Sequence, residues 1–483
     1  MDEKLTELEK LSSSLEPAAK HFHQMGSMAG NYISRFLNTL PKQPAYTRFN
    51  DSVDKLVSEP IEEHPGEFDK LLKIVEEEIV PPGLNPASGG HLGYIPGGGL
   101  PVSALADYIA AATNPYAGVY FSSPGAVNIE RRLISWMGEL LGYPETSGGY
   151  LSSGGSLANL TAIVTARESS KIKPSEIERT VVYLTNQTHH CVDRALNVAG
   201  LKDAIRRYIP MDDRFRMQTD ELQEQITEDK KAGLNPWLIV ASAGTTDAGA
   251  VDPLDEVAEI AERESLWFHV DAAYGGFFLL TDQGKKMLKG IERSDSVVLD
   301  PHKSLFIPYG LGALVVRDKK KLADAHSYHA DYMQDTKEQI SVLSPADLSP
   351  ELSKHFRALR LWLPLKLHGV AAFRAALEEK LLLAKYAWQK LNEMDNFETG
   401  PEPQLSVFMF RFNPGKGDID KLNKELHKAV TDDGRVFFST TKYKGNFVLR
   451  MAILSFRTHK HTIDLTLNII REKANKLMRD KQK

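Results

Sequence analysis

Cysteine and long hydrophobic runs are nearly missing from this sequence. Cys191 is the one cysteine, so no disulfide can form within the chain, and a free thiol fits a reducing compartment. No apolar run approaches the roughly 20 residues that a membrane-spanning helix requires. The charged N-terminal segment 1–7 lacks the apolar stretch of a signal peptide. We therefore expect a cytoplasmic protein with no membrane partner.

The sequence also lacks a strong excess of charge of either sign. Its 59 Lys and Arg residues nearly balance 64 Asp and Glu residues, which gives a net charge of -5 at pH 7. This balance gives no electrostatic reason to expect a nucleic acid as partner. At 483 residues, of which 42% are hydrophobic, the chain is long enough for a large core and more than one domain.

The pattern of helix and strand signals predicts three regions. Residues 1–85 are amphipathic and interrupted by proline, which predicts an N-terminal helical arm. We expect a large domain over residues 86–385 and a small α/β domain over residues 386–483. A Gly-rich passage at 88–99 lacks the spacing of a nucleotide-binding loop, so we interpret it as a closely packed loop near a ligand or a subunit interface.

Apolar strands alternate with helical stretches between residues 148 and 316. This alternation predicts an α/β domain with a mostly parallel sheet and helices on both faces. Residues 325–350 lack periodicity, so we expect a long mobile loop there. The predicted strands of the large domain are 180–185, 205–209, 236–242, 266–271, 295–299 and 311–316.

A carboxylate and an amine follow two of these predicted strands. One strand ends at Asp271, and the other leads through His302 to Lys303. The carboxyl ends of parallel strands meet at the edge of a sheet where ligands bind. Pyridoxal phosphate needs this pair: the amine forms a Schiff base with its aldehyde, and the carboxylate keeps the pyridine nitrogen protonated. Either residue alone has an ordinary structural explanation, but the two motifs together favour this cofactor.

Two further segments can contribute to such a site. The small residues 152–156 open a predicted helix, whose free N–H groups and dipole suit a phosphate, although such a sequence is also a common turn. His189 follows a strand and can stack on a cofactor ring. A zinc site built from His189, His190 and Cys191 is disfavoured, because three consecutive ligands do not converge tetrahedrally. We therefore predict no metal.

These motifs resemble those of the group II pyridoxal-phosphate-dependent amino-acid decarboxylases, from about residue 20 to the C-terminus. That family includes the aromatic-L-amino-acid, histidine, glutamate and cysteine-sulfinate decarboxylases. The most specific matches are His269-Val270-Asp271-Ala272-Ala273-Tyr274 and Pro301-His302-Lys303. The resemblance implies an aspartate-aminotransferase-like fold (fold type I) and a homodimer with active sites at its interface.

The resemblance also implies roles for individual residues. Lys303 is the Schiff-base lysine, Asp271 is the partner of the pyridine nitrogen, and His189 stacks on the ring. Asp300 stands where the aromatic branch has asparagine, and an anion beside a phosphate is unfavourable unless it turns away or is protonated. The further cofactor-binding residues are Gly155, Ser156, Thr246, Ala273 and His302.

Two departures from the aromatic branch bear on product and substrate. The loop position of the tyrosine that returns a proton after CO2 leaves falls at Pro345 or Ala346, so Tyr332 or His329 would supply that proton. Loss of the loop tyrosine is also how aldehyde synthases of this family arise. The residues that we expect to contact the substrate are Tyr94, Ile95, Pro96, Tyr120 and Phe121.

We predict decarboxylation of an L-amino acid, foremost an aromatic one, to its amine and CO2. Within the enzymes, the alternatives are an aldehyde synthase, a decarboxylase of acidic or sulfinic amino acids, and a C–C lyase acting on phosphorylated amino alcohols. A catalytically silent relative that serves as a binding protein is the alternative outside them. In a dimer, Tyr120, Phe121 or the 325–350 loop is placed to complete the partner's site.

Overall fold

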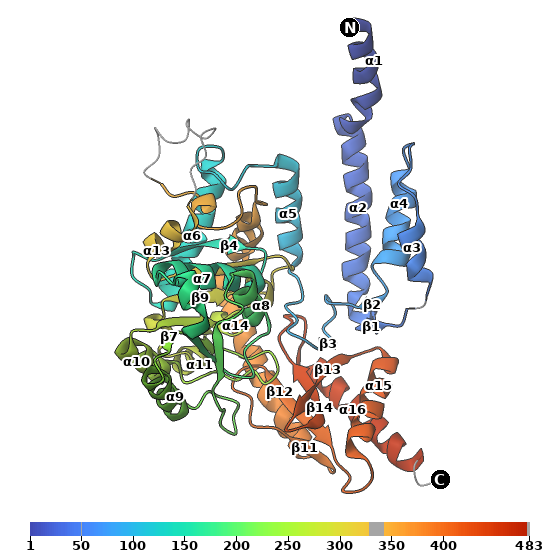
Figure 1. The fold of residues 1–483 in the computed structure, drawn as a ribbon. Coiled ribbons are helices and arrows are strands. Elements are labelled where there is room, and N and C mark those ends of the chain that lie inside the picture. Colours follow the sequence, from blue (N-terminus) through green and yellow to red (C-terminus); the bar gives the residue numbers. More distant parts are fainter. Residues whose placement is uncertain (50, 328–341, 481–483) are drawn as a thin grey trace.

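The computed structural model describes residues 1–49, 51–327 and 342–480 of the chain. These residues form a large domain around one sheet, a smaller domain around a second sheet, and an N-terminal helical arm (Figure 1). The active-site motifs of the sequence all fall in the large domain, so its sheet is described first.

The large sheet has seven strands among the described residues. Six of them run in the same direction, and β10 is antiparallel to both of its neighbours, β4 and β9. The sheet is thus largely parallel, as the sequence predicts, and joins the described helices in an α/β fold. In order across the sheet, the strands are β4 (Gly148–Ser152), β10 (Gly312–Val316), β9 (Ser296–Leu299), β8 (Trp267–Asp271), β7 (Asn235–Ser242), β5 (Thr180–Leu184) and β6 (Ile205–Tyr208).

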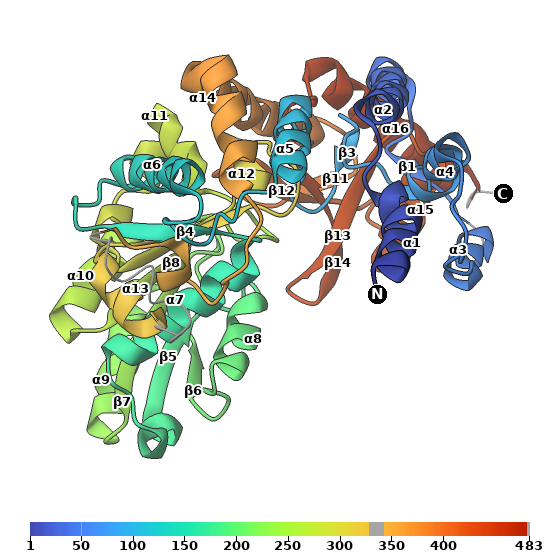
Figure 2. The ribbon, with the colours of Figure 1, turned by 90° about the horizontal axis from the view of Figure 1, so that it is seen from above.

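Two hydrophobic cores cover the two faces of this sheet, because side chains alternate along each strand. In β5, Val181 and Tyr183 enter one core, and Val182 and Leu184 enter the other. Figure 2 shows α6 and α14 on one side of the sheet and α7 and α8 on the other. The helices of the first core are α6 (Pro124–Leu141), α9 (Thr219–Lys231), α10 (Leu254–Glu264) and α14 (Arg357–Asn392); those of the second are α7 (Gly155–Ser169), α8 (Cys191–Val198) and α13 (Lys319–His326).

Strand β4 is not among the strands that the sequence predicts, because two glycines open it. Glycine lowers strand propensity, so the passage reads locally as a loop. In the structure, a Cβ atom at Gly149 would collide with the Leu314 carbonyl oxygen on β10. Glycine is therefore the residue that allows these two strands to pair at this register.

The small domain is built on a five-stranded sheet. Its strand β3 comes from residues 91–92, far from the rest in sequence, and pairs in parallel with β13. This pairing fastens the Gly-rich passage to the small domain. The strands, in order, are β11 (Phe397–Thr399), β12 (Val407–Phe412), β14 (Asn446–Ala452), β13 (Phe437–Tyr443) and β3 (His91–Leu92); the covering helices are α15 (Ile419–Asp433) and α16 (Lys460–Asp480).

The N-terminal arm lies beside the two sheets and extends away from them (Figure 1). Its short strands β1 (Tyr46–Thr47) and β2 (Gly83–Leu84) pair with each other. No residue of its first helix is buried in the single chain. The arm's helices are α1 (Asp2–Ser12), α2 (Ala19–Thr39), α3 (Lys55–Ser58) and α4 (Phe68–Ile74), and α5 (Pro101–Thr113) follows them in the chain.

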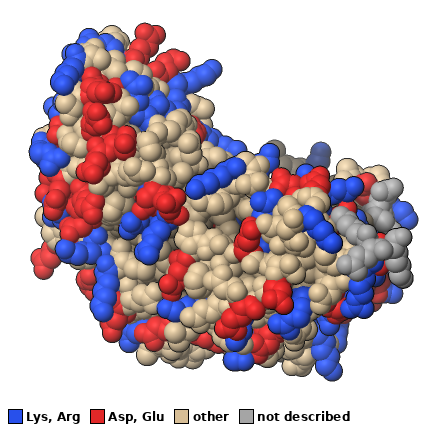
Figure 3. Space-filling model, turned by 90° about the horizontal axis from the view of Figure 1, so that it is seen from below, with Lys and Arg blue, Asp and Glu red and all other residues tan. Residues whose placement is uncertain are grey.

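The space-filling view shows acidic and basic side chains interspersed over the molecule, with a largely uncharged hollow between two lobes (Figure 3). Within the part of the chain that the structure describes, no helix is both long enough and apolar enough to cross a membrane. The predicted loop at 325–350 lies largely outside the described residues, which resume at residue 342.

The close approach at Gly149 makes a specific prediction about stability. We expect Gly149→Ala to lower the free energy of unfolding by about 2 kcal/mol, because the new methyl group must push β10 away. Thermal and urea unfolding of the full chain measure this change. Gly125→Ala on α6 is the matched control, since a Cβ there meets nothing within 4 Å. Equal stability of the two variants would contradict the argument.

Candidate active site

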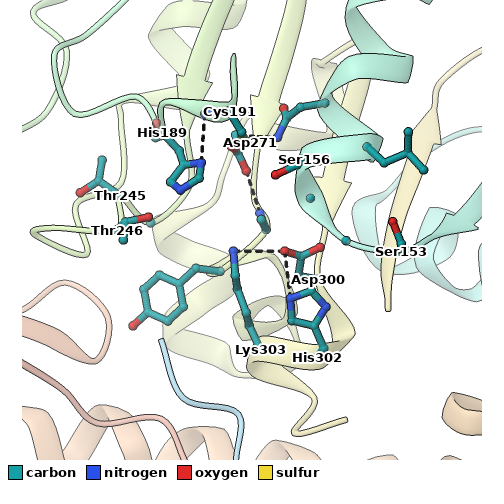
Figure 4. A pocket seen from close by; sticks show the side chains of 18 of the residues that line it. Ser153, Ser156, His189, Cys191, Thr245, Thr246, Asp271, Asp300, His302 and Lys303 are labelled. Carbon is teal, nitrogen blue, oxygen red and sulfur yellow. Dashed lines mark hydrogen bonds and ion pairs between the residues drawn. The ribbon is translucent and has the colours of Figure 1, made fainter. Parts of the chain in front are cut away.

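A cavity of about 380 Å³ lies where the parallel strands of the large sheet end. Its wall segments follow the carboxyl ends of β5, β7, β8 and β9, and the start of α7 closes one side (Figure 4). All nine residues predicted from the sequence to bind the cofactor line it. They are Gly155, Ser156, His189, Thr246, Asp271, Ala273, Asp300, His302 and Lys303.

Asp271 ends β8 and directs its carboxylate toward the cavity (Figure 4). The side chain is 8% exposed, and both of its oxygens accept hydrogen bonds. The Ala273 backbone N–H donates to Oδ1 over 3.1 Å, and the Asn159 amide donates to Oδ2 over 3.2 Å. These two donors satisfy and orient the buried carboxylate.

Lys303 lies on α12 (Pro301–Ser304), which follows β9. Its Nζ atom is 3.1 Å from Oδ2 of Asp300, and Nε2 of His302 is 3.5 Å from the same oxygen (Figure 4). Burial lowers the pKa of the Lys303 ammonium, but the carboxylates of Asp300 and Asp271 outweigh it, so the pKa lies above its usual value. Lys303 is therefore protonated in the single chain at neutral pH.

The first turn of α7 presents backbone N–H groups of the kind that can bind an anion. No side chain caps this helix at its N-cap residue, Gly154, so its leading N–H groups are open to a ligand. A Cβ at Gly155 would stand 2.9 Å from Oδ2 of Asp300, which shows how closely the carboxylate approaches this helix. The other carboxylate oxygen, Oδ1, is buried without a hydrogen-bond partner. Asp300 thus lies at the helix start rather than turned away from it.

His189 and Cys191 form the wall that continues from β5. The Cys191 backbone N–H donates to Nδ1 of His189 over 3.3 Å, so the imidazole carries its proton on Nε2 when neutral. Burial lowers the pKa of His189, which favours this neutral form. Burial also raises the pKa of the Cys191 thiol to about 12, so the thiol stays protonated at neutral pH.

The residues predicted to contact substrate do not line this cavity in the single chain. Ile95 is 8% exposed and packs in the core of the large domain, whereas Phe121 is 50% exposed on the surface. Their contact with substrate stays a prediction, as does that of Tyr94, Pro96 and Tyr120. The predicted proton donor Tyr332 and its alternative His329 lie outside the described residues.

Arg450 is a residue near the site to which the sequence assigned no role. It extends from β14 of the small domain and is 2% exposed. Its guanidinium donates to the backbone carbonyls of Tyr94, Thr246 and Asp247, and thereby joins the small domain to the rim of the cavity. It also donates to the Ser439 hydroxyl on the neighbouring strand β13. Nothing local in the sequence marks the contacts at the rim, because those three acceptors are backbone atoms.

Other lining residues escaped the sequence analysis although a signal was present. Asn159 is a polar side chain in the apolar first turns of α7, one turn after Ser156, and it is fully buried. Ser242, the last residue of β7, was also missed, whereas Thr245 belongs to the turn 243–247 after this strand, whose hydroxyls the sequence places within reach of a cofactor. Across the described ranges, no group of three or more His, Cys, Asp or Glu side chains is placed to hold a metal ion.

A sequence profile of the pyridoxal-dependent decarboxylase conserved domain matches residues 52–413. The chain therefore belongs to the pyridoxal-dependent decarboxylase family. It is a carboxy-lyase that acts on an amino acid, with pyridoxal phosphate as its cofactor.

Named relatives and solved structures agree with this assignment. The chain is 34% identical to an aromatic-L-amino-acid decarboxylase of Bacillus atrophaeus, over 93% of this chain and 94% of the relative. It is 28% identical to a phenylacetaldehyde synthase of Arabidopsis thaliana, over 95% and 97% of the two chains. Among solved structures, Oryza sativa TDC with PLP and tryptamine superposes with a TM-score of 0.89, at 27% identity, over 95% of this chain and 99% of the other.

The residues around the cavity fit pyridoxal phosphate. The start of α7 offers free N–H groups in a cradle that a Cβ would fill, which suits the phosphate. Lys303 provides a primary amine, and Asp271 an ionised partner for a ring nitrogen. Asp300 is the one discordant group, and its ion pair with Lys303 and contact with His302 offset its charge.

The ion pair between Asp300 and Lys303 predicts how fast the cofactor attaches covalently. Because the carboxylate raises the pKa of the amine, Asp300→Asn lowers that pKa, and more of Lys303 is unprotonated at pH 7.5. We expect pyridoxal phosphate to attach several-fold faster to the cofactor-free variant, with the rate–pH profile shifted to lower pH. Stopped-flow absorbance measures the rate. Asp282→Asn, at an exposed position on α11 (Asp282–Met287), is the control, and an unshifted profile in Asp300→Asn would refute the pairing.

Proposed function

We propose that this protein decarboxylates an aromatic L-amino acid to its amine and CO2. The observation that carries the proposal is the convergence of Lys303, Asp271 and His189 on one cavity at the ends of neighbouring strands. The aromatic class is supported by relatives that match over most of their length, which include tryptophan and tyrosine decarboxylases. A solved tryptophan decarboxylase of Catharanthus roseus, in complex with L-tryptophan, has a TM-score of 0.88 at 25% identity.

When bound, pyridoxal phosphate supplies an aldehyde that joins an amine and a ring that accepts the electrons left by departing CO2. We assign Lys303 to hold the aldehyde carbon, since it is the lysine among the lining residues. Asp271 would hold a proton on the ring nitrogen, because its carboxylate faces the cavity and two N–H donors fix its orientation. The first turn of α7 binds the phosphate.

His189 and Ala273 take the two faces of the cofactor ring in this proposal. His189 carries its proton on Nε2, and its depressed pKa keeps the imidazole neutral, so it can stack on a ring that bears positive charge. Thr246 follows β7 on the same rim as Arg450, whose contact with the Thr246 carbonyl positions the hydroxyl-bearing turn. His302 donates its Nε2 proton toward Asp300, since its Nδ1 accepts from the Leu311 N–H.

We further propose that the active unit is a homodimer whose sites lie at the interface. Along α1 and the turn after it, Leu5, Leu8, Leu11 and Leu15 are 58%, 51%, 69% and 83% exposed. An apolar stripe of this length is unfavourable in water and fits burial against a second chain. Phe121 is exposed and Tyr120 half-buried, and neither lines its own cavity, so we assign this aromatic pair to the partner's.

A substrate panel tests the reaction and its product. Cofactor-loaded protein is offered aromatic, acidic, sulfinic and basic L-amino acids while CO2 and hydrogen peroxide are followed together. We expect CO2 without peroxide, fastest with an aromatic substrate. Stoichiometric peroxide and ammonia would identify an aldehyde synthase instead, and neither product would refute decarboxylation. Lys303→Ala is the control, and it should lose both activity and the visible absorbance band at roughly 400–430 nm.

Complementation between two inactive chains tests the shared site. We expect Lys303→Ala and Tyr120→Ala/Phe121→Ala each to be strongly impaired as homodimers. In a mixed dimer, one site combines an intact Lys303 with the partner's intact aromatic pair, so activity should return to roughly half of the wild-type value per dimer. Chains with two different tags allow the mixed dimer to be isolated. A mixed dimer without activity, or a fully active double variant, would contradict the assignment.

A further inference from the structure

A continuous chain of buried polar side chains lies behind Asp271. Asn159 of α7 donates to Asp271, and Oδ1 of Asn159 is 2.8 Å from Nε2 of His269. On its other side, Nδ1 of His269 is 2.8 Å from the Ser296 hydroxyl, which also lies 3.0 Å from Nε1 of Trp267. The chain thus crosses from β8 to α7 and to the neighbouring strand β9.

The direction of each hydrogen bond in this chain follows from its two ends. At one end, an indole N–H can only donate, so the Ser296 oxygen accepts from Trp267 and its own proton is free to go to His269. At the other end, an ionised carboxylate can only accept, so Asn159 must present its NH₂ group to Asp271. That leaves the amide oxygen of Asn159 to accept from Nε2 of His269.

A neutral His269 satisfies both requirements with a single proton. Nε2 carries the proton that is donated to Asn159, and Nδ1 accepts from Ser296. Burial lowers the pKa of His269 to about 4, so the ring is neutral at physiological pH. The Cys191 thiol, 3.5 Å from the Asn159 NH₂ group, is a second weak acceptor and adds no charge, since burial raises its pKa.

Three buried polar side chains at this place in the core suggest a role that apolar side chains could not fill. Asn159, His269 and Ser296 are 0%, 1% and 0% exposed, and burying such groups costs free energy that apolar side chains would avoid. The surrounding core supplies apolar neighbours, including Val298 and Leu314. The three residues meet in one function that apolar side chains cannot provide: a fixed N–H donor on Oδ2 of Asp271.

We propose that Asn159, His269 and Ser296 are positioning residues that hold the Asp271 carboxylate ionised and aimed at the ring nitrogen of the cofactor. This inference rests on the role proposed above for Asp271. Trp267, at the far end of this hydrogen-bond chain, helps to fix the direction of every hydrogen bond in it. Ser296, His269 and Asn159 stand between Trp267 and Asp271.

The test compares pyridoxal phosphate with 1-deazapyridoxal phosphate, an analogue with carbon in place of the ring nitrogen. Dissociation constants of both are measured on full-length, cofactor-stripped protein by equilibrium dialysis. In the wild type we expect the natural cofactor to bind more tightly. In Asn159→Leu we expect this preference to shrink about tenfold, because a hydrogen bond to a charged group is lost and the carboxylate is no longer fixed.

Controls separate positioning from packing. Thr165 lies on the same helix as Asn159 and is also 0% exposed, but it is not part of the hydrogen-bond chain. Thr165→Val should therefore leave the preference for pyridoxal phosphate over its deaza analogue unchanged. Ser296→Ala removes one hydroxyl from the hydrogen-bond chain, between Trp267 and His269, and changes the side-chain volume little. We expect it to reduce the preference for pyridoxal phosphate as well, but by less than Asn159→Leu does. Equal weakening of both ligands in Asn159→Leu and Ser296→Ala, with the preference intact, would overturn the inference.

Asp271→Asn, measured in parallel, distinguishes this inference from the proposal on which it rests. If Asp271→Asn loses the preference but Asn159→Leu retains it, Asp271 acts on the ring nitrogen without help from the hydrogen-bond chain behind it. In that case only the inference is wrong. If Asp271→Asn retains the preference as well, the role proposed for Asp271 is wrong. Loss of the preference in both variants supports the two together.

Discussion

The parallel pairing of β8 with β9 is the constraint on which the site depends. In this register Asp271 lies opposite Val298, so β9 runs one residue further to Leu299 before α12 begins. The carboxylate and the amine therefore enter the same cavity from adjacent strands. A slip of β8 by one residue would turn the Asp271 side chain to the opposite face of the sheet, since successive side chains along a strand alternate. Apolar packing of both strands in the two cores fixes the register.

Charge in the cavity is balanced among few groups. Two buried carboxylates, Asp271 and Asp300, flank one ammonium, that of Lys303, and the nearby imidazoles are held neutral by burial. A buried charge is tolerated when it is paired or hydrogen-bonded. Asp271 receives two N–H donors, whereas Asp300 relies on Lys303 and His302. The two acids thus sit in different environments, which suits different roles toward one cofactor.

The small domain contributes to the site through backbone contacts rather than through side chains in the cavity. Arg450 joins β14 to the carbonyls of Tyr94 and Thr246, and β3 joins the Gly-rich passage to β13. A Cβ at Gly97 would collide with the His302 carbonyl oxygen, so this passage packs directly against the lysine-bearing turn. The Gly-rich segment is thus a closely packed loop next to the site, as its composition predicts.

The sequence alone determined the chemistry, because the motifs at Asp271 and Lys303 are local and each directly follows an apolar strand. It also predicted the parallel strands, whose apolar runs are short and bounded. It missed β4, where Gly149 lowers strand propensity and only the approach of β10 explains the glycine. Asn159 and Arg450 were missed because the groups that they contact at the cavity are distant in the chain, and those that Arg450 contacts there are backbone carbonyls. Only the tertiary structure decides such contacts, since they depend on which strands become neighbours and not on any local pattern.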